Sequence, residues 1–141
     1  MNAESEICTL LDYIVDATRA KDIDALIRHY SPEVLAFDII DPLQYSGETA
    51  LRERAAAWFS SFHGPIHYEL AELKIIAADG VAVCHGLSHV VGTTTKGREL
   101  KMWWRTTYGL QKRGDRWLIT HVHSSVPFSP HSGAASLSLE P

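Results

Sequence analysis

Four strand-like segments in the second half of the chain constrain the fold more than any other feature of the sequence. They are rich in β-branched and aromatic residues and cover residues 66–77, 81–94, 98–112 and 116–125. The turns between them are Asp79-Gly80, Lys96-Gly97 and Arg113-Gly114-Asp115. Such turns are typical of β-hairpins, so the strands are predicted to be antiparallel neighbours. Because each segment exceeds the usual five or six residues, the sheet is predicted to twist and curl.

The first half of the chain predicts helices. Residues 4–21 carry apolar side chains at helical spacing. A shorter helix follows Asp22, which is a suitable N-cap, and ends before Pro32. A β-like stretch over residues 34–40 and a loop over residues 41–47 lead to a third helix over residues 48–62. The predicted fold is therefore α+β: a cone-shaped, curved, mostly antiparallel sheet with three N-terminal helices packed on its concave face.

The composition is that of one ordinary domain. The chain has 141 residues, of which 45% are hydrophobic and 21% charged. This is enough apolar content for a core that needs no disulfide or metal to stabilise it. We expect residues 1–125 to form the domain and residues 126–141, with their prolines, to form an irregular C-terminal tail. Cys8 and Cys84 are expected to be buried side chains rather than a disulfide.

Charge and hydropathy limit the kinds of partner that the protein is expected to have. The net charge of -4 argues against nucleic acid as the main partner. No apolar run approaches the ~20 residues that a membrane span needs, and the amino-terminal sequence is acidic where a signal peptide is basic. We therefore expect a cytoplasmic protein with no nucleic-acid and no membrane partner. The sequence also lacks the motifs of serine nucleophiles, phosphate loops, dinucleotide sites and paired cysteines.

Eight histidines are the unusual part of the composition. A curled sheet leaves a pocket at its mouth, and the alternation of side chains along each strand indicates which residues point into it. We assign to this wall one face from each of the last three strands. The polar and aromatic side chains on those faces are Trp117, His121 and His123 from the last strand, Trp103 and Arg105 from the strand before it, and His85 and His89 from the strand before that. No role is assigned to His29, His63, His67 and His131.

Asp38 is the most informative charged residue, because it lies in the apolar run 35–40, where an unpaired carboxylate is costly. Apolar neighbours in the pocket would raise its pKa and suit it to general-base catalysis, whereas a nearby Arg105 would lower the pKa and leave a structural ion pair. Both interpretations stay open.

The spacing His121-x-His123 also occurs in metal sites. A complete site would need further ligands, and only His85, His89 or Asp38 could supply them. A cupin-like metal oxygenase would need a glutamate shortly after the His pair, and the sequence has none there. We therefore expect no metal.

Several motifs, in the same order of helices and strands, resemble those of a known family. They are the loop Pro42 to Gly47, the segment Trp58 to Pro65, the motif Trp103-x-Arg105-x-Thr107, and the stretch Gly114 to Phe128. On these motifs, which span nearly the whole chain, the sequence resembles the SnoaL-like, or ketosteroid-isomerase-like, group of small bacterial proteins in the nuclear transport factor 2-like superfamily, with its cystatin-like cone fold.

This resemblance implies cofactor-independent chemistry. In steroid isomerases of the superfamily an Asp on the first strand moves a proton alpha to a carbonyl, and a Tyr with a protonated Asp forms the oxyanion hole. Asp38 looks like the counterpart of the base. Tyr13 is one position out of register, with Ile14 in its place, and one position is about 100° of helix rotation. Classical steroid isomerase activity is therefore not expected, whereas polyketide cyclase-like chemistry remains open.

Two function classes follow. The first is an isomerase, cyclase or lyase without cofactor that acts on a small, apolar or aromatic carbonyl compound, with Asp38 as the base, His121 or His123 as the partner acid and Arg105 as the enolate stabiliser. The expected ligand-binding residues are Tyr45, Trp58, Trp103, His85 and His89. The alternative is a non-catalytic ligand-binding or dimerisation domain.

An unpaired Asp38 in a deep pocket would favour the enzyme, whereas an Asp38–Arg105 ion pair in a filled core would favour the alternative. In either case we expect a homodimer through the outer face of the sheet, because an apolar patch there would be a liability on a monomer. The residues expected to form this patch are Trp104, Thr106, Tyr108, Leu118 and Val122.

Overall fold

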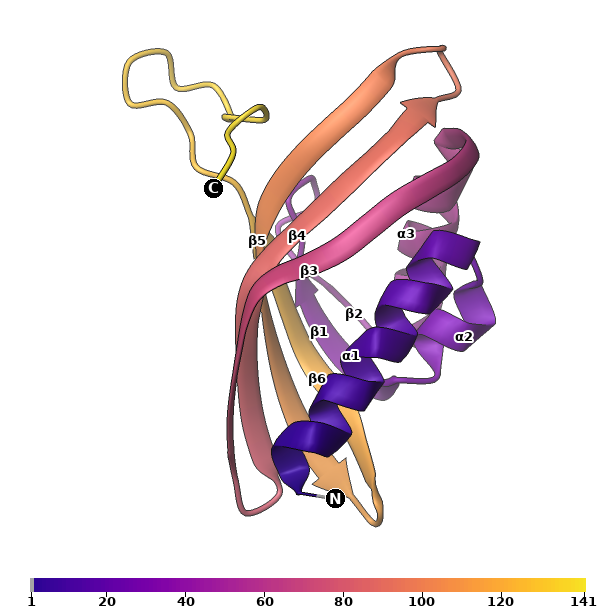
Figure 1. The fold of residues 1–141 in the computed structure, drawn as a ribbon, viewed down its shortest axis with the longest axis vertical. Helices are drawn as coiled ribbons and strands as arrows, with labels where there is room; N and C mark the ends of the chain where they lie inside the picture. Colours follow the sequence, from indigo (N-terminus) through magenta and orange to yellow (C-terminus); the bar gives the residue numbers. More distant parts are fainter. Residues whose placement is uncertain (1) are drawn as a thin grey trace.

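A single curved sheet of six strands forms the frame of the protein in the computed structural model, which describes residues 2–141 (Figure 1). The elements are α1 (Ala3–Ala20), α2 (Ile23–Ile27), β1 (Tyr30–Phe37), β2 (Tyr45–Ser46), α3 (Glu48–Ser60), β3 (Phe62–Ala78), β4 (Val81–Thr94), β5 (Glu99–Arg113) and β6 (Arg116–Ser125). The strand order is β2-β1-β6-β5-β4-β3. Only the β1–β6 pairing is parallel among these strands. The predicted α+β fold is confirmed.

Helix α1 lies across the hollow of the sheet (Figure 1). Its first turn is capped by Asn2, whose side-chain oxygen accepts a hydrogen bond from the Ser5 N–H at 2.8 Å. Its last turn ends at Lys21, which has φ 54°. The buried stripe of α1, from Ile7 to Ile14, packs in one cluster with inward side chains of β4, β5 and β6. Apolar spacing on one helix face thus produces the main core.

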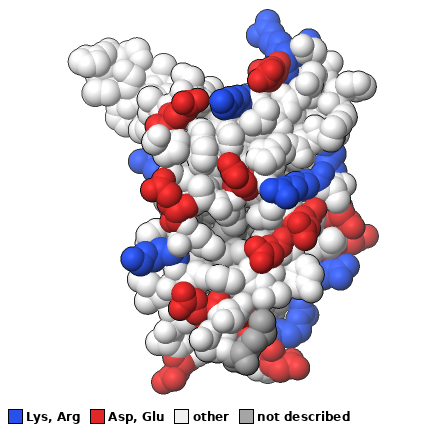
Figure 2. Space-filling model, viewed as in Figure 1, with Lys and Arg blue, Asp and Glu red and all other residues white. Residues whose placement is uncertain are grey.

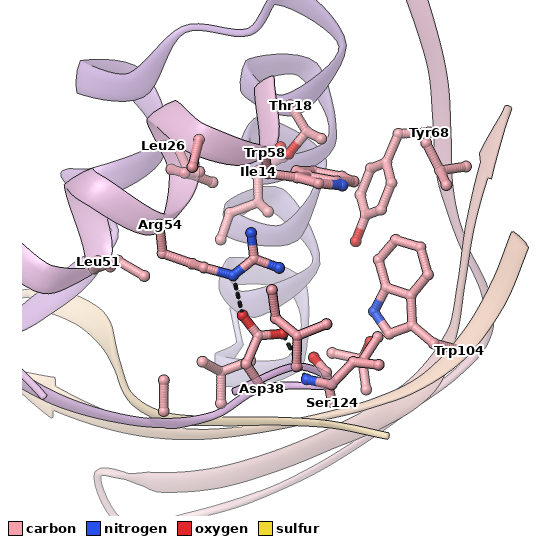
Figure 3. A pocket seen from close by; sticks show the side chains of 18 of the residues that line it. Ile14, Thr18, Leu26, Asp38, Leu51, Arg54, Trp58, Tyr68, Trp104 and Ser124 are labelled. Atoms are coloured by element: carbon pink, nitrogen blue, oxygen red, sulfur yellow. Dashed lines mark hydrogen bonds and ion pairs between the residues drawn. The ribbon is translucent and has the colours of Figure 1, made fainter. Parts of the chain in front are cut away.

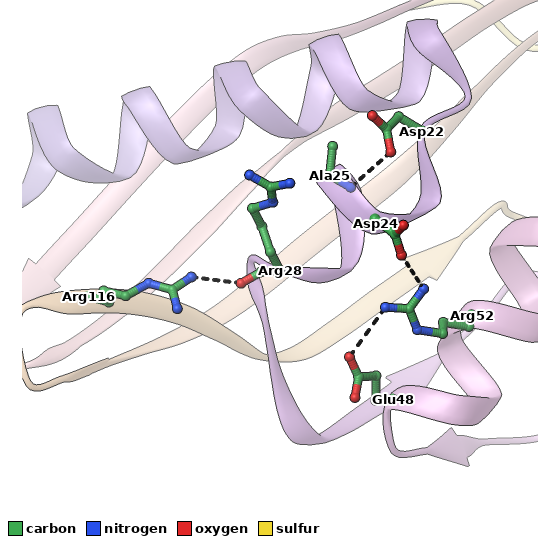
Figure 4. Close-up of polar contacts among 7 residues, drawn as sticks. All are labelled: Asp22, Asp24, Ala25, Arg28, Glu48, Arg52 and Arg116. Carbon is green, nitrogen blue, oxygen red and sulfur yellow. Dashed lines mark hydrogen bonds and ion pairs between the residues drawn. The ribbon is translucent and has the colours of Figure 1, made fainter.

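Helix α2 is short and is held by polar contacts at both ends (Figure 4). Asp22 accepts a hydrogen bond from the Ala25 N–H at 3.0 Å, and Arg116 of β6 donates to the Arg28 carbonyl at 2.8 Å. Arg52 of α3 reaches Asp24 at 2.7 Å. These contacts tie α2 to both β6 and α3.

The three predicted hairpins are present, and glycines with positive φ occupy their turns, including Gly80 (φ 71°) and Gly114 (φ 65°). Strand β3 bends where its pairing with β4 slips between Ala71 and Lys74. Gly86 faces this irregularity, and a Cβ atom there would lie 2.9 Å from the Ala71 carbonyl oxygen. The close approach of the two backbones therefore requires glycine.

Two details of the first half differ from the sequence prediction. Strand β1 begins at Tyr30 rather than at residue 34, because the irregular pairing with β6 between Tyr30 and Leu35 accommodates Pro32. Strand β2 lies within the predicted loop and pairs Tyr45 with Ala36. The expectation that both cysteines are buried is wrong for Cys8, which is exposed on α1, and holds for Cys84; both are free thiols.

The surface carries both signs of charge. Figure 2 shows acidic and basic side chains interspersed over one face of the molecule, so the charges on that face form no field of one sign. Among the described residues, no helix has the length and apolar content needed to cross a bilayer. Residues 126–141 follow β6 as turns with one isolated bridge, Phe128 to Ala135.

Candidate functional site

A β-bulge in β6 decides which side chains enter the hollow of the sheet. Gly109 of β5 lies opposite His121, but its neighbour Leu110 lies opposite Ile119, so Thr120 is an extra residue without a partner in the β5 ladder. Such an insertion reverses the alternation of side chains along the strand. Trp117 and Ile119 point inward before the bulge, and Val122 and Ser124 line the cavity after it.

The prediction that His121 and His123 line the cavity is therefore wrong, since both lie on the convex face. The His121 ring nitrogen Nδ1 is 2.8 Å from the Leu35 carbonyl oxygen of β1. Both rings pack edge-on against Phe37, with centroid distances of 4.7 Å for His121 and 5.3 Å for His123. Strict alternation from Trp117 gives the opposite result because it contains no signal for the bulge.

Strand β5 was also assigned the wrong inward face. Its side chains that line the cavity are Leu100, Met102, Trp104, Thr106 and Tyr108. Trp103 and Arg105 therefore lie on the convex face, where the Arg105 Nε donates a hydrogen bond to the Ser125 hydroxyl at 3.0 Å. The physical reason is solvation, because Arg105 is exposed on the outer face and its guanidinium keeps its hydration there.

The same correction applies to β4. Cys84 and Val90 point inward and are buried, so His85 and His89 lie on the convex face. The prediction of an apolar patch on the outer face is also wrong, because four of its five residues point inward. Trp104, Thr106, Tyr108 and Val122 line the cavity. Of the residues in that patch, only Leu118 points outward, because it lies between the inward-facing Trp117 and Ile119 on β6.

The cavity has a volume of about 530 Å³ and lies between the helices and the concave face of the sheet (Figure 3). Its walls are mainly apolar and aromatic. The aromatic side chains that line it are Tyr30, Tyr45, Trp58, Tyr68, Trp104 and Tyr108. The Trp104 ring lies 6.0 Å from each of the Trp58 and Tyr68 rings. A site of this size and lining suits a small organic ligand with an apolar body.

Asp38, Tyr45 and Trp58 are the sequence-predicted site residues that the structure places on the cavity wall. Asp38 directly follows β1. Its Oδ1 accepts a hydrogen bond from the Ile39 N–H at 2.7 Å, and its Oδ2 accepts one from the Arg54 Nε at 2.6 Å. Its side chain is only 17% exposed. The partner of Asp38 is thus a helix arginine, not Arg105. The structure therefore has neither the unpaired Asp38 nor the Asp38–Arg105 pair in a filled core that were expected to separate the two function classes.

Arg54 was missed by the sequence analysis, although a signal for it exists. Residues 51, 54, 55 and 58 follow helical spacing, so Arg54 interrupts the apolar stripe formed by Leu51, Ala55 and Trp58. Its guanidinium end lies between Trp58 and Asp38 in the close-up (Figure 3). Since only Nε contacts Asp38, the two terminal nitrogens face the cavity and are positioned to donate to a ligand oxygen.

Three tyrosines form the polar part of the inner wall. Burial raises the pKa of Tyr30 and Tyr68 and raises that of Tyr108 well above its ordinary value, with the neighbouring phenols adding to the effect on Tyr108. The Tyr68 hydroxyl lies 3.1 Å from the Ser88 hydroxyl, which lies 2.6 Å from that of Thr106. These phenols are therefore neutral hydrogen-bond donors at physiological pH.

Tyr45 brings a fourth phenol close to Asp38. Burial, and then the negative charge of Asp38, raise the pKa of Tyr45 to about 12. The charge of Asp38 also raises the pKa of Tyr30, after larger contributions from burial and the other tyrosines. Both phenols are thus within electrostatic reach of the carboxylate.

Tyr13 lies outside this arrangement. It is 58% exposed and stacks on His29, whereas Ile14 lines the cavity. The one-residue offset read from the sequence therefore corresponds to a real difference in direction. Among the described residues that line the cavity there is one carboxylate, Asp38, and no histidine or cysteine, so the wall itself offers no set of metal ligands.

Comparison with known proteins gives a consistent family. The model of the SnoaL-like domain matches residues 7–129. A nuclear transport factor 2-like protein of unknown function from Pseudomonas putida KT2440 is 32% identical, with 99% of this chain and 96% of that chain covered and a TM-score of 0.89. The comparison with curated proteins gives no match.

More distant solved structures share the fold. A ketosteroid isomerase-like protein from Erwinia carotovora atroseptica SCRI1043 is 19% identical, with 89% and 97% of the two chains covered and a TM-score of 0.75. A protein of unknown function with a cystatin-like fold from Nostoc punctiforme is 13% identical, with 90% and 94% covered and a TM-score of 0.75. These two similarities concern the fold alone.

Proposed function

The chain belongs to the SnoaL-like domain family, and on this premise we propose that it is a cofactor-independent enzyme that moves a proton on a small, largely apolar carbonyl compound. One observation carries the proposal: Asp38 is a mostly buried carboxylate at the wall of an aromatic cavity, with neutral phenols nearby. Carboxylate base, apolar body site and hydrogen-bond donors are the parts that enolisation requires.

In the proposed reaction, Asp38 removes a proton from the carbon next to the carbonyl group. The electron pair of the broken C–H bond moves to the carbonyl oxygen and forms an enolate. In an isomerisation the proton then returns from Asp38 to another carbon. In a ring closure the enolate carbon attacks a second carbonyl carbon of the ligand, and Asp38 protonates the new alkoxide. In an elimination the enolate expels a β-substituent, which takes the proton from Asp38 as it leaves. Asp38 is a base in the first half of each route and an acid in the second.

The enolate oxygen needs donors that are already in place. Tyr30 and Tyr45 are suitable because both stay protonated at neutral pH and because the charge of Asp38 raises the pKa of both. Arg54 takes over the role that the sequence analysis gave to Arg105, since its terminal nitrogens face the cavity. Trp58 and Trp104, whose rings contact each other edge to face, would pack against the apolar body of the ligand from the cavity wall.

The proposal is tested by proton exchange. Wild-type protein in D₂O with small aryl ketones such as β-tetralone should accelerate exchange of the α-protons, which NMR follows directly. Asp38→Asn should slow this exchange by about 10²- to 10⁴-fold, the usual contribution of a general base. The matched control is Asp12→Asn, an exposed acid on α1, which should leave the rate unchanged.

The same experiment separates the enzyme from the ligand-binding alternative. If the ketone quenches tryptophan fluorescence but its protons exchange equally fast with wild-type and Asp38→Asn protein, the cavity binds without catalysis. The Asp38–Arg54 pair would then be structural, since both carboxylate oxygens already have partners.

We also propose that two copies associate through the convex face of the sheet. The support is the set of apolar and aromatic side chains that point out of the convex face and are half-buried in the single chain. Its members are Phe37, Leu87, Trp103 and Leu118. A second sheet face would cover these side chains without touching the cavity.

A further inference from the structure

A cluster of two histidines and one glutamate lies on the convex face, away from the cavity. His67 and Glu69 are two residues apart on β3, and His89 of β4 lies directly opposite Glu69. Their ligand atoms all lie within 4.8 Å of one another. We propose that His67, Glu69 and His89 form a binding site for a divalent transition-metal ion of the zinc, cobalt or nickel class. The proposal is independent of the function proposed for the cavity.

The donor set fits this class of ion. Imidazole nitrogen and carboxylate oxygen are the usual ligands of zinc, with bonds of about 2.0–2.2 Å. Ligand atoms around a tetrahedral centre with such bonds are roughly 3.3 Å apart. The His89 Nδ1 and Glu69 Oε1 are already 3.1 Å apart, and the His67 Nε2 and Glu69 Oε2 are 3.9 Å apart. A small rotation of the outer side chains closes the remaining gap.

The inner half of the cluster is held rigidly. His89 is only 8% exposed, and its ring stacks on Trp103 with a centroid distance of 4.1 Å and an interplanar angle of 8°. Glu69 contacts His89 from the neighbouring strand. Orientation of a ligating imidazole by its surroundings is what a metal site needs, because it reduces the ordering that binding must impose.

The outer half is open to solvent. His67 and Glu69 lie on β3, an edge strand of the sheet, and in the single chain their side chains are 52% and 43% exposed. An ion can therefore reach the cluster from this edge without any movement of the backbone. Three protein ligands leave at least one coordination position for water or another ligand, as in zinc sites that are not purely structural. With neutral histidines the cluster carries one negative charge, which a dication offsets.

A simpler interpretation is that Glu69 and His89 are only a hydrogen-bonded pair and that His67 is an ordinary surface residue. The two interpretations differ in the role of His67. A hydrogen-bonded pair needs no third member, whereas a metal site loses one of its three ligands when His67 is removed.

The experiment uses untagged protein titrated with Zn²⁺ by calorimetry and with Co²⁺ by visible absorption. We expect one ion per chain and the d–d absorption of a low-symmetry Co²⁺ site. His67→Ala and Glu69→Gln should each weaken binding by about tenfold or more, on the scale of changes at known metal sites. His67 is exposed and Glu69 is partly exposed, so these variants should fold normally.

The matched control is His85→Ala, an exposed histidine on the same face of β4 that lies outside the cluster; it should leave the affinity unchanged. Absence of binding to wild-type protein overturns the proposal. So does a His67→Ala variant with wild-type affinity, or a loss in His85→Ala equal to that in His67→Ala, because either result means that surface histidines bind the ion without a formed site.

Discussion

The concave and convex faces of the sheet come from the same strands but carry different chemistry. The concave face presents tyrosines, tryptophans and one carboxylate, most of them buried under the helices. The convex face presents histidines and Arg105, whose polar atoms contact the neighbouring strands, as His121 does with the Leu35 carbonyl and Arg105 with Ser125. Along β5 the two sets are adjacent in sequence, as in Trp104, which lines the cavity, and Arg105, which lies outside. The difference teaches that a shift of one residue in a strand exchanges one chemistry for the other.

The bulge at Thr120 is where this comparison is decided. Without it, the odd-numbered residues of β6 from Trp117 to His123 would share one face, and both histidines would enter the cavity. With it, the inward set changes from odd to even positions, and Val122 and Ser124 take their place. The cavity consequently has phenols rather than imidazoles as its donors.

Deletions in β6 give the largest expected effect. Removing Leu118 should turn Trp117, which is 5% exposed, out of the core and lower the free energy of unfolding by about 2 kcal/mol or more. Removing Thr120 should cost less than half as much, because the extra residue disappears while Ile119 and Val122 keep their inward direction. Urea unfolding measures both. Equal losses would mean that Thr120 is not simply an inserted residue.

The phenols of the concave face predict a loss of stability at high pH. Burial raises the pKa of Tyr30, Tyr68 and Tyr108 above 10, the ordinary value, and raises that of Tyr45 to about 12. A group whose pKa is higher in the folded state than in the unfolded state makes its full contribution to stability at pH values below its unfolded-state pKa. This contribution is lost as the pH rises through the folded-state pKa.

The urea midpoint should therefore be independent of tyrosine ionisation up to about pH 10 and fall between about pH 10 and 12. Tyr68→Phe, which removes one of the buried phenols, should make this fall shallower. Tyr13→Phe is the control, since Tyr13 is 58% exposed. An identical alkaline fall in wild-type and Tyr68→Phe protein would contradict the assignment of burial as the cause.

The smallest effect on stability is expected on the convex face. Leu118→Glu should change the free energy of unfolding by less than about 1 kcal/mol, as is usual for surface positions. It should nevertheless convert the proposed dimer to a monomer, because a carboxylate would be buried without a partner in the interface. Light scattering of both proteins at equal concentration checks this, and a monomeric wild type would contradict the proposed dimer.

Much of the fold was predictable because its signals are local. The apolar spacing from Ile7 to Ile14 gave α1, and the turn glycines gave the long hairpins. The position of Asp38 in an apolar strand marked a residue of the cavity wall. Arg54 could have been found by the same helical spacing that placed Trp58, since the two residues are one turn apart.

The inward faces of the strands were not predictable, because alternation separates two faces without saying which is buried. Tyr68 illustrates this limit: its strand partner Val90 and its hydroxyl partner Ser88 both come from β4, and nothing near Tyr68 in sequence identifies them. His89 is likewise 20 residues or more from His67 and Glu69 in the sequence and lies on another strand. The short spacing of His67 and Glu69 does not identify it.

The sequence by itself determined the three helices and the four long strands, their order and their turns, because helical periodicity, strand composition and glycine conformation depend on residues close together in the chain. Only the tertiary structure decided which face became the cavity wall. That choice depends on the bulge at Thr120, on the register of β4, β5 and β6, and on the helix that covers one face. Pairing across strands and burial against α1 are long-range effects, and they placed phenols and Asp38 inside and left the histidines outside.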